Sequence, residues 1–113
     1  MRAGELDRKV TLLEPKTQLD SSGTGQAVET FVPRGDVWAG VTPLSGREAL
    51  AAAQRHPETT HRFRMRWRSR ADLNEAWRIR HDGRDWNITE ILEIGRREGL
   101  DVMATASPAE NPA

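Results

Sequence analysis

The chain has 113 residues, carries 17 Lys and Arg against 17 Asp and Glu, and contains no cysteine. This length fits one domain that hides roughly two-thirds of its unfolded surface on folding. The lack of cysteine excludes a disulfide scaffold, a thiolate metal site and a cysteine nucleophile. No apolar run approaches the ~20 residues of a membrane span, and the first residues lack the apolar core of a signal peptide. We therefore expect an intracellular soluble protein.

The first third of the chain predicts strands and turns. Residues 6–13 alternate apolar and polar side chains, and Pro15 is expected to end this run. The predicted elements that follow are a Gly/Ser-rich loop at 18–26, a strand at 27–32, a turn at 33–36 and a strand at 37–42.

A helix is predicted next. Ser45 and Glu48 have capping-box spacing, and the Ala-rich residues behind them favour a helix of about three turns that Pro57 ends. Leu50 is its one large apolar side chain, so the helix has a poor hydrophobic stripe. We expect it to pack weakly on its own domain or closely against a neighbour.

The second half of the chain contains the most regular alternation of apolar and charged residues. Between residues 59 and 70, Phe63, Met65 and Trp67 alternate with arginines, which predicts a strand with one buried face. Asp82-Gly83 lies between two alternating runs and predicts a hairpin. Further strands are predicted at 88–94 and 100–106.

Together these elements predict a mainly β protein: a small antiparallel β-barrel of six or seven strands with an inserted loop and one short α-helix. The predicted domain spans 1–106, with the helix-containing insertion at about 43–61 and a flexible tail at 107–113. The predicted core consists of Val10, Leu12, Trp38, Val41, Phe63, Met65, Trp67, Trp77, Ile79, Trp86, Ile88, Leu100 and Val102.

The neutral total conceals an uneven distribution of charge. Of the 17 basic residues 15 are arginine, and residues 62–84 hold eight arginines and three acids, a net of +5, which leaves −5 for the remainder. The strand at 59–70 places five arginines on one face: Arg62, Arg64, Arg66, Arg68 and Arg70.

Three interpretations of this arginine face remain open. It could be solvated, with the side-chain stems covering apolar surface. It could pair with acids of the same chain, such as Glu90, Glu93 and Glu98, or of a neighbouring subunit. It could also contact a nucleic-acid backbone, although the zero net charge weakens the case for a free DNA binder.

The sequence offers little for catalysis. His56, His61 and His81 lack metal-ligand spacing, and no phosphate loop or nucleophile elbow is present. We expect no catalytic, cofactor or metal site. His61 is interpreted as a polar surface or interface residue, and His81 as a solvated residue of a hairpin tip.

The order of these motifs resembles a known family. The matching segments are MRAGELDRKVTL at 1–12, VWAGVTP at 37–43, the Ser45–Glu48 run with its Ala-rich extension, THRFRMRW at 60–67, WRI with GRDWNI at 77–88, and the strand from Leu100 to Ala104. Over roughly residues 1–106 the chain resembles the phage head–tail joining family, the head-closure or stopper proteins of long-tailed phages and of gene transfer agents. Trp67 and Trp86 stand where that family often has Tyr, which preserves the aromatic bulk.

The resemblance implies a structural subunit without enzymatic activity or cofactor. Copies would form a ring of six or twelve subunits, with portal and adaptor proteins above and tail terminator or tail tube proteins below. The ring would close the channel of packaged double-stranded DNA, contact that DNA without sequence specificity, and have no membrane partner. It would belong to a virion or phage-like particle, at the head–tail interface, assembled in the host cytoplasm.

Within that expectation, the arginine face is a candidate subunit interface or channel surface. The candidate partner-contact or gating segment consists of Ser45, Arg47, Glu48, Leu50, Gln54, Arg55, His56 and His61. The alternative is a stand-alone nucleic-acid-binding barrel of the OB type that uses the strand from Arg62 to Arg70.

Overall fold

The computed structural model describes residues 3–19, 27–67 and 72–107, and within them six antiparallel strands close into a barrel. Around the barrel the strand order is β1-β2-β3-β6-β5-β4, with β4 returning to β1. The elements are η1 (Ala3–Glu5, a 3-10 turn), β1 (Arg8–Leu19), β2 (Ala27–Pro43), α1 (Gly46–Ala53), β3 (His61–Arg66), β4 (Arg78–His81), β5 (Arg84–Ile94) and β6 (Gly99–Ala106). The predicted fold class is confirmed.

The barrel interior holds the side chains that alternate inward along each strand. Phe63 and Met65 are fully buried, and the arginines that alternate with them, Arg62, Arg64 and Arg66, point outward. Ten predicted core residues are buried: Val10, Leu12, Phe63, Met65, Trp77, Ile79, Trp86, Ile88, Leu100 and Val102. Val41 and Trp67 are partly buried and pack against this cluster.

The prediction that Trp38 belongs to the core is wrong, because its side chain is 57% exposed. Val37 packs against the core and Ala39 is buried within it, so alternation along β2 turns the intervening Trp38 to the outer wall. The prediction took aromatic bulk as a sign of burial, whereas the face of the strand decided it.

β2 is also longer than predicted. Instead of two strands and a turn at 33–36, one strand runs through that segment. Leu12 pairs with Gly35 and Leu13 with Pro33, so Arg34 is an extra residue in a β-bulge, and Gly35 has a φ of +140°. The Pro and Gly that suggested a turn here belong to this bulge.

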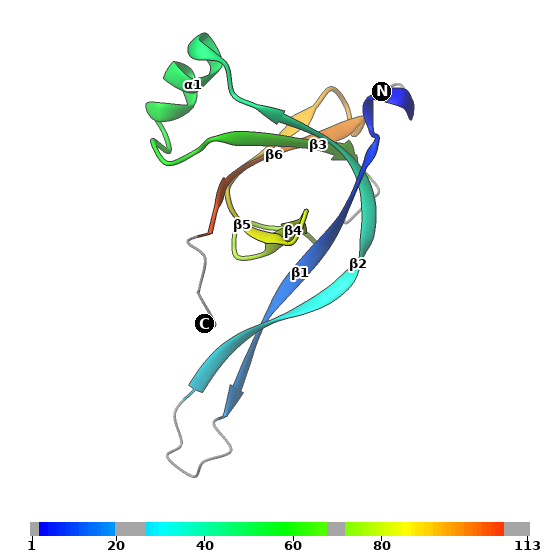
Figure 1. The fold of residues 1–113 in the computed structure, drawn as a ribbon, viewed down its shortest axis with the longest axis vertical. Coiled ribbons are helices and arrows are strands. Elements are labelled where there is room, and N and C mark those ends of the chain that lie inside the picture. Colours follow the sequence, from blue (N-terminus) through cyan, green and yellow to red (C-terminus); the bar gives the residue numbers. More distant parts are fainter. Residues whose placement is uncertain (1–2, 20–26, 68–71, 108–113) are drawn as a thin grey trace.

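Beyond the bulge, residues 14–19 of β1 and 27–33 of β2 continue as a two-stranded arm. Pro15 does not end β1, because it pairs with Phe31 at a position where β1 has no other neighbour among the described strands. The arm projects away from the barrel at the bottom of Figure 1, whereas α1 lies at the top. The molecule accordingly measures 49 × 28 × 26 Å. Most of the predicted loop at 18–26 lies outside the described residues.

α1 has eight residues and is shorter than predicted. Ser45 precedes it in an extended conformation but makes no side-chain capping hydrogen bond. The carboxylate of Glu48 instead accepts a hydrogen bond from Arg62 of β3, and Arg55 donates to Glu90 of β5. Since β6 lies between β3 and β5, these bonds hold the segment of α1 over the outer face of β6, where Met103 is buried.

The predicted hairpin at Asp82-Gly83 is confirmed between β4 and β5. Asp82 has a φ of 55° and Gly83 a φ of 75°, so both central residues are left-handed, as a type I′ turn requires. Most of the predicted tail at 107–113 lies outside the described residues, but the backbone N–H of Ser107 donates to Asp85. The domain boundaries stay a prediction.

Candidate functional site

The arginine face of β3 is the first candidate. His61–Arg66 forms the strand, and Arg62, Arg64 and Arg66 alternate with the buried Phe63 and Met65. Arg68 and Arg70 lie outside the described residues, so the structure places three of the five predicted arginines on one outer face.

Two of these three arginines are paired within the chain. Arg62 Nη1 donates to Glu48 Oε2 at 2.6 Å. Arg64 makes a two-pronged contact with Asp101 of β6, with Nε to Oδ1 at 2.8 Å and Nη2 to Oδ2 at 2.9 Å. This hydrogen bonding raises the pKa of Arg64 despite the opposing effect of burial, and the negative charges of Asp101, Glu5 and Glu48 add to it.

The partners differ from those considered from the sequence. Glu90 pairs with Arg55, and Glu93 accepts the backbone N–H of Arg97. In the part of the chain that the structure describes, no carboxylate pairs with Arg66. Much of the positive charge of this face is therefore neutralised by Glu48 and Asp101, which leaves Arg66 available to a partner.

We expect Arg64 and Asp101 to stabilise the barrel as a unit. Because Arg64 is partly exposed and Asp101 nearly buried, a double-mutant cycle with Arg64→Ala and Asp101→Ala should give a coupling energy of about 1 kcal/mol in chemical unfolding. The Arg80–Asp85 pair is the matched control, because its side chains are more exposed and its coupling should be smaller. A coupling of zero for Arg64 and Asp101 would contradict this expectation.

The predicted contact segment forms the second candidate. Leu50 is 72% exposed on α1, and Ser45, Arg47 and Gln54 are also exposed. Glu48 and Arg55 are held to the barrel by their ion pairs, and the N–H of Leu44 donates to Thr60 where the segment leaves and rejoins the barrel. His56 is half-buried and lies 3.8 Å from the carboxylate of Glu58. The segment is therefore tethered at several points and presents Leu50 outward.

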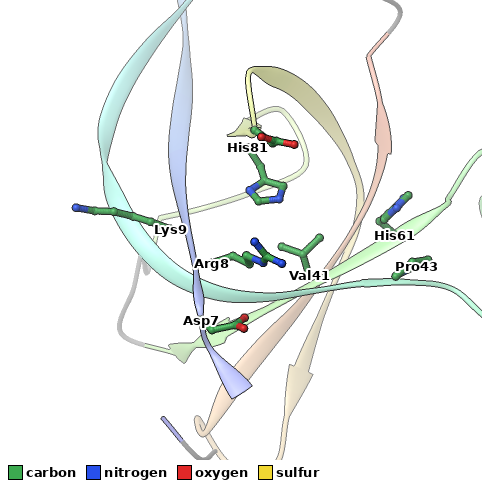
Figure 2. A pocket seen from close by; sticks show the side chains of 8 residues that line it. Asp7, Arg8, Lys9, Val41, Pro43, His61 and His81 are labelled. Atoms are coloured by element: carbon green, nitrogen blue, oxygen red, sulfur yellow. The ribbon is translucent and has the colours of Figure 1, made fainter. Parts of the chain in front are cut away.

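A cavity of about 620 Å³ opens at one end of the barrel (Figure 2). It is lined by Asp7, Arg8, Lys9, Val41, Pro43, His61, His81 and Asp82. Of its polar lining residues, only His61 and His81 were considered for chemistry from the sequence, and Asp82 was considered only as a turn residue. The cavity could not be recognised from the sequence, because the start of β1 and the ends of β2 and β4 come together only when the barrel closes.

The two histidines pack on core rings at this opening. The ring of His61 lies 4.6 Å from that of Trp86 and the ring of His81 lies 6.0 Å from that of Phe63, both edge to face. His81 is half-buried rather than solvated, because closure of the barrel brings the end of β4 over Phe63. Desolvation lowers the pKa of His61 below the usual 6.5, and the positive charges of Arg84 and His81 lower it further.

This lowered pKa predicts acid sensitivity. In the folded chain His61 binds its proton less readily than in the unfolded chain, so the unfolded state takes up more protons once the pH falls below about 6.5. The melting temperature should therefore drop between pH 7 and pH 5, and His61→Gln should reduce that drop. His56→Gln, at a histidine that does not line the barrel opening, controls for the substitution itself. An unchanged pH profile in His61→Gln would contradict the assignment.

Within residues 3–19, 27–67 and 72–107 no group of three His, Cys, Asp or Glu side chains is placed to hold a metal ion. None of the helices described here has the length and apolar character to cross a membrane. The structure presents four features to possible partners: the arginine face, the exposed side of α1, the barrel opening and the arm.

Comparisons with known proteins identify one family and two solved structures with a similar fold. A family model described as phage head completion protein matches residues 1–107. The solution structure of protein SF1141 from Shigella flexneri 2a is 28% identical, covers 98% of this chain and 100% of its own, and superposes with a TM-score of 0.77. A chain in the virion of a native gene transfer agent particle shares the fold at 22% identity and a TM-score of 0.56. The match covers 88% of this chain and 92% of the virion chain. No curated protein matches the sequence.

Proposed function

The chain belongs to the phage head completion protein family, and from this premise we propose that it is a head-closure subunit of a phage or phage-like particle. Copies would form a ring below the portal and adaptor and above the tail. The ring would close the DNA channel after packaging and offer the surface to which the tail attaches. The family match over residues 1–107 carries this proposal.

The shape of the subunit supports a role between two neighbouring structures. The arm and α1 project at opposite ends of the long axis, so one subunit can contact different partners at its two ends (Figure 1). The fold shared with a chain of a gene transfer agent virion is consistent with assembly into such a particle.

Genetic deletion followed by add-back tests the proposal. Particles made without the gene should contain heads that fail to retain DNA or to join tails. Purified chain added to those heads should restore DNA retention against nuclease and restore tail joining. A Leu50→Asp variant, altered in the contact segment, is added back to the same heads and compared with the unaltered chain. Because Leu50 is exposed, this substitution should leave the fold intact. Normal tailed, DNA-filled particles in the deletion strain would overturn the proposal.

The alternative of a stand-alone nucleic-acid-binding barrel is weakened by the ion pairs of Arg62 and Arg64. Both side chains would have to leave Glu48 and Asp101 to contact phosphates. We therefore expect the isolated chain to bind single-stranded and duplex DNA no tighter than the ~100 µM typical of weak non-specific binding at physiological salt. A fluorescence titration across salt concentrations checks this. Micromolar binding with a steep salt slope, lost in Arg64→Ala/Arg66→Ala, would favour the alternative instead.

A further inference from the structure

Trp38 is a large apolar side chain left uncovered on the outer wall of the barrel. It is 57% exposed, whereas Trp77 and Trp86 are buried and Trp67 packs against the core. The turn η1 covers the neighbouring position on β2, where the backbone of Glu5 crosses Gly40, but it leaves Trp38 open. Isolated exposed side chains are common on protein surfaces, so the neighbours of Trp38 decide whether it marks an interface.

Those neighbours are basic. Lys9 of β1 is the direct cross-strand partner of Trp38 and is 61% exposed. On the other side, Ala39 pairs with Met65, so the next register position sets Trp38 opposite Arg66 on the same outer face. Lys9 has only a loose contact with Asp36 at 4.0 Å, and Arg66 has no carboxylate partner among the described residues. Lys9, Trp38 and Arg66, called the Trp38 patch here, thus join an exposed aromatic ring to two available cations.

The arm exposes an apolar and an acidic side chain, which complement the aromatic ring and the cations of the Trp38 patch. Val28 is 45% exposed, and the adjacent Glu29 is exposed without an ion pair in the described part of the chain. In this region β2 pairs with β1 alone, because its pairing with β3 covers only residues 39–43. The edge of β2 in the arm is therefore free, and a two-stranded ribbon by itself is only marginally stable in water.

The base of the arm is anchored so that the arm extends outward. Arg34 donates to Glu14 at 2.7 Å across the two strands. The guanidinium of Arg78, from β4, lies 4.1 Å from the centre of the Phe31 ring. From Pro33 to Ala27 the arm reaches about 20 Å beyond the bulge, which suffices to reach past the outline of its own barrel onto an adjacent molecule.

We propose that the arm of one copy docks on the Trp38 patch of the next. The free edge of β2 would lie against the patch, with Val28 on the Trp38 ring and Glu29 beside Lys9 or Arg66. This contact joins two different surfaces of identical subunits, and such head-to-tail contacts close into rings when the rotation permits. Trp and Arg are also the side chains that most often dominate interface energy. The inference rests on the proposed ring and identifies the occupant of one of its interfaces.

Cysteine pairing tests this contact cleanly, because the chain has no cysteine of its own. Thr17 is exposed on β1 directly opposite Glu29, so Thr17→Cys reports on the arm without altering Val28 or Glu29. Lys9→Cys reports on the patch and keeps Trp38 and Arg66. The two single variants of the full chain are mixed and mildly oxidised, and the 17–9 disulfide is measured by mass spectrometry of peptides. Thr17→Cys mixed with Arg96→Cys, an exposed basic site elsewhere, is the matched control.

We expect the 17–9 disulfide to exceed the 17–96 disulfide by at least about tenfold. Arg66→Glu in the Lys9→Cys chain should lower the 17–9 yield by a similar factor, because it sets two carboxylates against each other. Glu29→Arg in the Thr17→Cys chain should restore it. Equal 17–9 and 17–96 yields, or a charge exchange without effect, would overturn the proposal. All these positions are exposed, and circular dichroism verifies folding of each variant.

This measurement is independent of the head-closure assay. A 17–9 disulfide in a chain that fails to complete heads would preserve the contact and overturn the proposed function. Heads completed by a chain without that disulfide would preserve the function and overturn the contact.

Discussion

Gly40→Ala is expected to destabilise the protein by about 2 kcal/mol, although it adds a single methyl group. A Cβ at this position would lie 2.5 Å from the backbone oxygen of Glu5, where η1 crosses the outer face of β2. A backbone atom cannot give way as the end of a flexible side chain can. The substitution should therefore push η1 off the barrel and expose Leu6, which is 5% exposed in the native structure.

Gly46→Ala is the matched control for this effect. It adds the same methyl group at the first residue of α1, where nothing lies within 4 Å of the new atom. Because Ala favours helix more than Gly, this variant should be as stable as the parent or slightly more so. Urea unfolding of both variants checks the comparison. Equal stability of the two would show that η1 does not require the close approach at Gly40.

Phe63→Ala should cost about 3–5 kcal/mol, enough to consume much of the stability of a small domain. Phe63 is fully buried, its ring lies 5.3 Å from that of Trp86 and 6.0 Å from that of His81, and it sits on the strand that carries the arginine face. Removing it leaves a cavity that strands on all sides of a closed barrel cannot collapse to fill.

Trp38→Ala provides the control for Phe63→Ala. It removes a larger ring, but from an exposed position on the outer wall, so the isolated chain should lose less than about 0.5 kcal/mol. Chemical unfolding at low protein concentration measures both variants in the absence of self-association. A greater loss for Trp38→Ala than for Phe63→Ala would mean that Trp38 supports the fold itself, and not a contact surface.

Local patterns predicted the parts of this protein that depend on neighbouring residues. The alternation around Phe63 and Met65 identified the buried face of β3 because side chains of a strand alternate strictly between its two faces. Asp82-Gly83 identified its hairpin because a type I′ turn needs two left-handed residues in sequence. The proline and glycine at 33–36 led to a wrong prediction of a turn, since a β-bulge and a turn use the same residue types.

Other features depended on partners far away in the chain. The capping-box spacing of Ser45 and Glu48 was present, but Glu48 pairs with Arg62 instead, across the gap between α1 and β3. Arg64 pairs with Asp101, 37 residues later, which no local pattern could reveal. Which of these residues pair depends on which strands become neighbours when the barrel closes.

By itself, the sequence determined a single small β-barrel with one short inserted helix, most of its core, and its family, because these follow from alternation, turn chemistry and the order of motifs. Only the tertiary structure decided which arginines are neutralised, that Trp38 faces outward, and that the arm extends beyond the barrel. Each of these depends on strand register and on barrel closure, which bring together residues that are distant in sequence.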